Sequence, residues 1–162
     1  ALLRGMCRRI AHRGPDAYGE FVVSGVALGH QRLSIIDVSG GGQPLGTEDG
    51  SVQIVFNGEI YNFLELRREL EARGHAFWSR TDTEVILAAY REWGVDCLSR
   101  LHGMFAFAII DLREPGVPRV FLARDPAGEK PLFVAVAGEE TGTEAENNAF
   151  LVALKSALMT RR

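Results

Sequence analysis

The stretch Ile54–Asn62 reads IVFNGEIYN, and it decides how the rest of the chain is interpreted. Its first three residues, 54–56, are a β-branched and aromatic run that is typical of a strand. Asn57-Gly58 follows, a pair that tolerates unusual backbone angles and marks turns, so we expect the strand to break there. A strand that ends in a carboxamide and a glycine can present a side-chain NH2 beside a backbone N–H. Two such donors are what a tetrahedral oxyanion needs, although the pair taken alone more often marks an ordinary turn.

Length and composition indicate one soluble globular domain over residues 1–162, with 46% hydrophobic and 24% charged residues. The net charge of −3 gives no reason to expect nucleic acid or an anionic membrane as partner. No apolar run reaches the length of a membrane span. Cys7 and Cys97 have no metal-ligand spacing, so we expect no disulfide framework and a reducing, cytoplasmic location.

The pattern of the chain predicts strands in hairpins together with a few helices. We expect helices over residues 1–11, from Asn62 to Gly74 and over 82–93, with Asn62 and Glu65 forming a capping box. The expected strands are two around Ser24-Gly25 and further strands at 32–38, 54–56, 104–111, 120–124, 132–137 and 150–154. Antiparallel hairpins beside a pair of neighbouring helices favour an α+β layered domain over a parallel sheet.

The glycine-rich segment Ser39–Pro44 (SGGGQP) is a weak candidate for a phosphate-binding loop. It contains no lysine and no closing Ser or Thr, so the Walker pattern fails. It also lacks the Asp-Ser ending of the pyrophosphate loop in ATP-using amidating enzymes. We therefore interpret it as a flexible connection.

Several motifs occur in a characteristic order along the chain. They are HRGPD (12–16), LGHQRLSIIDVSGGGQPL (28–45), IVFNGEIYN (54–62), SRTDTEVILAAY (79–90), GMFAFAIID (103–111) and ARDPAGEKPLF (123–133). Over about residues 11–135 the chain resembles the class II glutamine amidotransferase domain of the asparagine synthetase family. HRGPD and NGEIYN favour that branch over the phosphoribosyl, glucosamine and glutamate-synthase branches.

The resemblance implies an α+β, four-layer αββα sandwich with antiparallel sheets, the N-terminal-nucleophile hydrolase fold. Such a domain hydrolyses glutamine to glutamate and ammonia, with a cysteine at the mature N-terminus as nucleophile. The ammonia passes to a C-terminal synthetase domain that activates aspartate. The resemblance implies no cofactor and no metal in this domain, with ATP and Mg only in the synthetase domain. Glutamine and the synthetase domain are the implied partners, and a homodimer is left open.

The resemblance also assigns roles to individual residues. Arg32 is similar to the residue that pairs with the glutamine α-carboxylate, a task that suits a planar guanidinium. Asn57 and Gly58 resemble the oxyanion-hole donors, and Asp82 resembles the carboxylate that holds the α-ammonium group. The remaining implied pocket residues are Ile35 and Ile36, through their backbone, and Glu59. The alternatives are a surface strand residue at Arg32, a helix N-cap at Asp82 and a solvated acid at Glu59.

No cysteine stands where the family has its nucleophile. Cys7 precedes His12 by only five residues and lies in the predicted helix. Removal of Met6 would place Cys7 at an N-terminus but delete the helix and leave no strand to carry the thiol. Cys97 fits a buried packing residue. Two explanations remain open: a fragment without the family's first strand, or a glutaminase-dead structural domain like that of β-lactam-forming synthetases. The retained Arg32, Asn57 and Asp82 favour the fragment.

Overall fold

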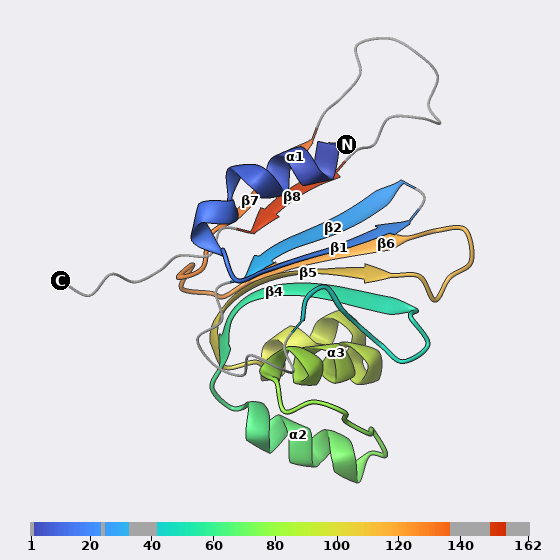
Figure 1. The fold of residues 1–162 in the computed structure, drawn as a ribbon. Coiled ribbons are helices and arrows are strands. Elements are labelled where there is room, and N and C mark those ends of the chain that lie inside the picture. The colour runs from blue at the N-terminus through green and yellow to red at the C-terminus, as the bar shows by residue number, and fades with distance from the viewer. Residues whose placement is uncertain (1, 24, 33–41, 137–149, 155–162) are drawn as a thin grey trace, which may run out of the picture.

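The fold has four layers, two of β-strands between two of helices (Figure 1). The computed structural model describes residues 2–23, 25–32, 42–136 and 150–154. Helix α1 (Leu2–Arg9) lies over a layer formed by two hairpins, and a four-stranded sheet separates this layer from α2 and α3. The expected α+β architecture with antiparallel sheets is confirmed. Ile35 and Ile36 lie outside the described residues.

The paired strands in the described part of the chain are antiparallel, as the hairpin pattern predicted. The hairpins are β1 (Ala17–Val23) with β2 (Val26–Arg32), and β7 (Leu132–Val136) with β8 (Phe150–Leu154). The larger sheet has the order β3 (Leu45–Gly46), β4 (Val52–Ile60), β5 (Gly103–Asp111) and β6 (Arg119–Arg124). In this sheet the two central strands, β4 and β5, are paired over their whole length.

The two faces of β4 belong to two different cores because side chains alternate along a strand. Ile54 and Phe56 contact the core beneath α2 and α3. Val55 instead packs with Leu28 of β2 in a smaller core between the two sheet layers. By the same alternation, Asn57 faces the space between the sheets.

The helices form where capping and burial favour them. In α2 (Phe63–Ala72), Leu66 and Leu70 are buried, and Gly74 follows the C-cap with φ +95°. Helix α3 (Asp82–Trp93) begins after the N-cap Thr81, whose hydroxyl accepts from the Glu84 N–H at 3.3 Å. It ends at Gly94 (φ +59°), and a 3₁₀ segment, η2 (Gly94–Arg100), follows. The predicted helices are therefore confirmed, but the N-cap alternative for Asp82 is wrong because Asp82 is the first helical residue.

Two local predictions around β4 are wrong. The strand does not break at Asn57-Gly58 but continues to Ile60, because β5 supplies a partner for each residue. The Asn62 side chain makes no capping bond to α2. Its Nδ2 donates to the Arg100 carbonyl at 2.9 Å and its Oδ1 accepts from the His102 N–H at 3.0 Å. Asn62 therefore links the end of β4 to the start of β5.

Helix α1 and the short 3₁₀ segment η1 (Ala11–Arg13) confirm the predicted N-terminal helix. Cys7 is buried against β2: a Cβ added at Gly29 would lie 2.5 Å from its Sγ. Both cysteines are free thiols. No helix in the described part of the chain is long and apolar enough to cross a membrane.

Candidate active site

The candidate site lies at the Asn57–Ile60 end of β4, where alternate backbone amides face opposite edges of the strand. The Tyr61 N–H, next along the chain, donates to the His102 carbonyl on the β5 side at 2.7 Å. Phe56 and Ile60 donate on the other side: to Gln43 Oε1 at 2.6 Å and to Asp82 Oδ2 at 3.0 Å.

Gly58 lies between these two residues in the same alternation. Its partner on β5 is Phe105, whose backbone bonds to the β6 side instead. The Phe105 N–H donates to Asp125 Oδ2 at 3.1 Å, and the Phe105 carbonyl accepts from the Asp125 N–H at 2.8 Å. Gly58 and Phe105 are therefore a non-hydrogen-bonded pair. The Gly58 N–H consequently points away from β5, toward the edge at which Gln43 and Asp82 bind.

Only glycine fits at position 58. Its φ of +154° is rare for residues with a side chain. A Cβ there would lie 2.1 Å from the Met104 carbonyl oxygen and 2.7 Å from Phe105 Cα. The close approach of β4 to β5 therefore requires Gly58, independently of any chemistry at its N–H.

Arg32 and His30 reach the space between the sheets from β2. The His30 ring has the backbone of Phe56 as a hydrogen-bond partner, and Arg32 is close enough for its charge to act on the ring. Burial, with a smaller contribution from Arg32, lowers the pKa of His30 to about 4. Arg32 is half-buried at the end of β2, not an exposed surface residue. Through this bond to His30, Phe56 is in contact with the opposite sheet layer just before Asn57.

Asp82, the first residue of α3, lies at the edge of β4 beside the site. Besides the Ile60 N–H, its carboxylate accepts from backbone N–H groups at the start of α3. Burial raises the pKa of Asp82, these backbone bonds act against the rise, and the charge of Glu59 adds to it. Glu59 itself is exposed. Two carboxylates therefore lie near the Gly58 N–H, in a position to attract a cationic group.

The structure thus brings Asn57, Gly58, Glu59 and Asp82 together at one strand end, with Arg32 entering from the other sheet. The sequence interpretation missed Gln43 and His30. Both lie within the quoted motif of residues 28–45, but their partners are on β4, so no local pattern identifies their role. The described residues contain no group of three or more His, Cys, Asp or Glu side chains suited to a metal ion.

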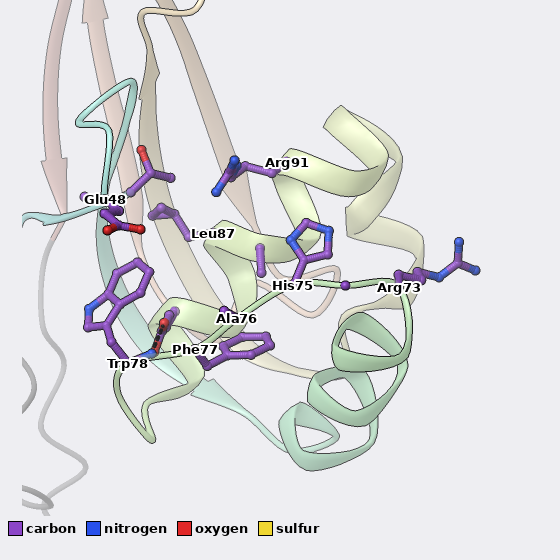
Figure 2. Close-up of a pocket in the computed structure, with 13 residues that line it drawn as sticks. Glu48, Arg73, His75, Ala76, Phe77, Trp78, Leu87 and Arg91 are labelled. Atoms are coloured by element: carbon purple, nitrogen blue, oxygen red, sulfur yellow. Dashed lines mark hydrogen bonds between the residues drawn. The ribbon is translucent and has the colours of Figure 1, made fainter.

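A separate depression of about 750 Å³ lies on the helical side of the larger sheet (Figure 2). It is formed by the connection between α2 and α3, by α3 and by the β3–β4 turn, with Trp78, His75 and Arg91 on its walls. Asn57, Gly58 and Asp82 are not among its lining residues. The depression is therefore distinct from the candidate active site.

Comparison with known proteins assigns the class. The family described as "Glutamine amidotransferase domain" matches residues 1–160, so the chain belongs to this family. Asparagine synthetase [glutamine-hydrolyzing] 1 of Bacillus subtilis (strain 168) is 46% identical over 152 residues, covering 94% of this chain and 24% of the relative. Asparagine synthetase [glutamine-hydrolyzing] 1 of Arabidopsis thaliana is 41% identical over 129 residues, covering 80% of this chain and 21% of the relative. The chain thus spans about a quarter of the length of the first relative.

Solved structures agree with this assignment. The glutamine phosphoribosylpyrophosphate amidotransferase of B. subtilis, complexed with ADP and GMP, aligns with a TM-score of 0.56 and 28% identity, covering 78% of this chain and 27% of that one. A structure described as the allosteric regulatory enzyme of purine biosynthesis aligns with a TM-score of 0.55 and 31% identity, covering 70% of this chain and 26% of that one. The resemblance to class II amidotransferases and the expected N-terminal-nucleophile hydrolase fold are both confirmed.

Proposed function

We propose that this chain is the glutaminase domain of a glutamine-dependent asparagine synthetase, which hydrolyses glutamine to glutamate and ammonia. The observation that carries the proposal is the direction of the Gly58 N–H. It lies beside Asn57, between amides held by Gln43 and Asp82, and faces the strand edge instead of β5. With the Asn57 carboxamide it supplies the pair of donors that stabilise an oxyanion.

The other site residues take the two ends of the amino-acid substrate in this proposal. Arg32 binds the α-carboxylate, as a planar guanidinium does best. Asp82, with Glu59 beside it, binds the α-ammonium group, whose positive charge would offset the unfavourable burial of the Asp82 carboxylate. The backbone of Ile35 and Ile36 completes the pocket in the proposal.

Neither cysteine of the chain suits the role of nucleophile, which requires a thiolate. Cys7 and Cys97 are both buried. Burial raises the pKa of Cys7 and raises that of Cys97 to about 11. We place the nucleophilic cysteine in the full-length protein, outside these 162 residues. The same observation supports the rival proposal, a structural domain that hydrolyses no glutamine.

The remaining proposals follow from the relatives. Ammonia released here would be used by a synthetase domain with ATP and Mg, and glutamine hydrolysis itself would need no cofactor. Free, buried thiols are consistent with a cytoplasmic enzyme.

The test is glutamate release from glutamine by the full-length protein. Asn57→Ala should lower kcat about 100- to 1,000-fold and leave KM nearly unchanged, since an oxyanion donor acts only in the transition state. Asn62→Ala is the matched control, because that carboxamide joins β4 to β5. It should destabilise the protein by about 1–3 kcal/mol and keep kcat. A full-length protein that carries an N-terminal cysteine but releases no glutamate would establish the structural alternative.

A further inference from the structure

The motif ARDPAGEKPLF (123–133) supplies none of the proposed substrate-binding residues, but its Asp125 holds the backbone of Phe105 opposite Gly58. Asp125 is only 4% exposed. Its Oδ2 accepts from the N–H groups of Phe105 at 3.1 Å and Lys130 at 3.0 Å, and its Oδ1 accepts from Glu129 at 2.8 Å. Burial opposes ionisation, but together these backbone N–H groups and that of Gly128 hold the pKa of Asp125 below its ordinary value.

Asp125 extends β6 by one residue where the strand ends. The last strand pair is Ala106 with Arg124, so Phe105 would lack a partner on this side. The Asp125 N–H supplies a donor for the Phe105 carbonyl, and the Asp125 carboxylate supplies an acceptor for the Phe105 N–H. The N–H and the carbonyl of Phe105 therefore both form hydrogen bonds on the β6 side, to Asp125.

The turn after β6 fixes Asp125 in place. The Arg124 guanidinium donates from Nε to the Lys130 carbonyl at 2.7 Å and from Nη2 to the Gly128 carbonyl at 2.5 Å. Residues 124–130 therefore form a closed turn around one buried carboxylate. This turn holds the Phe105 backbone, not only its own loop.

The Phe105 backbone in turn sets the position of Gly58. The two residues are directly opposite, and β4 and β5 are so close there that a Cβ on Gly58 would lie 2.7 Å from Phe105 Cα. A Phe105 N–H released from Asp125 would be free to turn toward β4. That movement would shift Gly58 and change the direction of its N–H.

We propose that Asp125 is a positioning residue for glutamine hydrolysis: it fixes the Phe105 backbone and so directs the Gly58 N–H toward the oxyanion. This inference rests on the proposed function, because it assumes that Gly58 donates to the reacting group. Asp125 touches neither substrate nor the donor itself. Misplacement of a donor by about 1 Å can cost on the order of 100-fold in rate.

Asp111 provides a matched control at the opposite end of β5. It is also a buried carboxylate, 6% exposed, whose pKa is held low by Arg113. Its Oδ2 accepts from the Tyr90 hydroxyl at 3.1 Å and from Arg113 at 2.6 Å. It lies opposite Val52, roughly 20 Å along the strand from Phe105. Loss of either carboxylate should destabilise the fold, but only Asp125 is connected to Gly58.

The experiment compares Asp125→Asn and Asp111→Asn in the full-length protein, at a temperature at which both variants are folded. Asp125→Asn should lower kcat about 10- to 100-fold with KM nearly unchanged, and Asp111→Asn should lower Tm but keep the wild-type kcat. Equal kcat values in wild type and Asp125→Asn would overturn the inference, whatever their Tm.

A second measurement does not depend on catalysis. In the 162-residue chain, Asp125→Asn should speed hydrogen exchange at the Phe105 amide and move the ¹H–¹⁵N signal of Gly58, and Asp111→Asn should do neither. Unchanged signals at both positions would overturn the inference. If the wild-type full-length protein releases no glutamate while these signals respond, the proposed function fails and the structural coupling stands.

Discussion

Protonation of His30 provides a quantitative test of how the two sheet layers meet. The ring is half-buried beside Phe56, and among the described residues its buried Nδ1 has no hydrogen-bond partner. Its pKa is lowered from 6.5 to about 4 in the folded protein, so the unfolded chain binds more protons between these values. Stability is therefore greatest above pH 6.5 and falls as the pH decreases toward 4. For this single group, the expected loss between pH 7 and pH 5 is about 2 kcal/mol.

The assay is urea unfolding of the wild type and His30→Gln at pH 7 and pH 5, at constant ionic strength. Glutamine keeps an amide that can bond to the Phe56 backbone but removes the titrating group, so the variant should lose about 2 kcal/mol less than the wild type between the two pH values. Equal losses in the wild type and His30→Gln would show that His30 is not held neutral between the sheets.

Three further predictions concern the site. Gly58→Ala should destabilise the fold by about 2–5 kcal/mol, because it combines an unfavourable φ with a clash against β5. The control Gly116→Ala, with φ +78° and open space around it, should cost only about 1 kcal/mol. Equal urea midpoints for the two variants would contradict the close approach of β4 to β5 at Gly58. Arg32→Ala in the full-length protein should lower kcat/KM about 10- to 100-fold, the equivalent of roughly 1.5–3 kcal/mol, and equal kcat/KM for glutamine and an analogue without the α-carboxylate would refute its role. Cys7→Ala and Cys97→Ala should retain the wild-type kcat for glutamate release, and loss of kcat in a folded Cys7→Ala variant would place the nucleophile in this chain.

The helices and hairpins could be predicted because their signals are local. Helix α3 begins after a Thr that accepts from the Glu84 N–H and ends at a glycine with positive φ. The end of β4 could not be predicted in the same way. Asn57-Gly58 has the composition of a turn, but pairing with Ala106 and Phe105 extends the strand. Tertiary pairing here overrides a local turn preference.

The same distinction applies to the site. The order of the motifs makes Asn57, Arg32 and Asp82 site candidates, since Asn57-Gly58 taken alone indicates an ordinary turn. Gln43 and Asp125 could not be assigned a role, because each binds a backbone N–H on a strand that is distant in sequence. A side chain that binds the backbone of a distant residue does not require a particular residue type there, so the sequence contains no motif spacing that would identify the contact. Both residues nevertheless lie within the ordered motifs, at 28–45 and 123–133.

The continuation of β4 past Asn57 changes the physical basis of the proposed oxyanion hole. At a turn, the direction of the Gly58 N–H would depend on a few local dihedral angles. In a strand it is set by the alternation of the ladder, with Phe56 and Ile60 held by Gln43 and Asp82 on the same edge. Asp125 binds the N–H and the carbonyl of Phe105 on the β6 side, so the Phe105 backbone stays turned away from Gly58. The donor is thus oriented before any charge develops, and this preorganisation is what makes a hydrogen bond effective in catalysis.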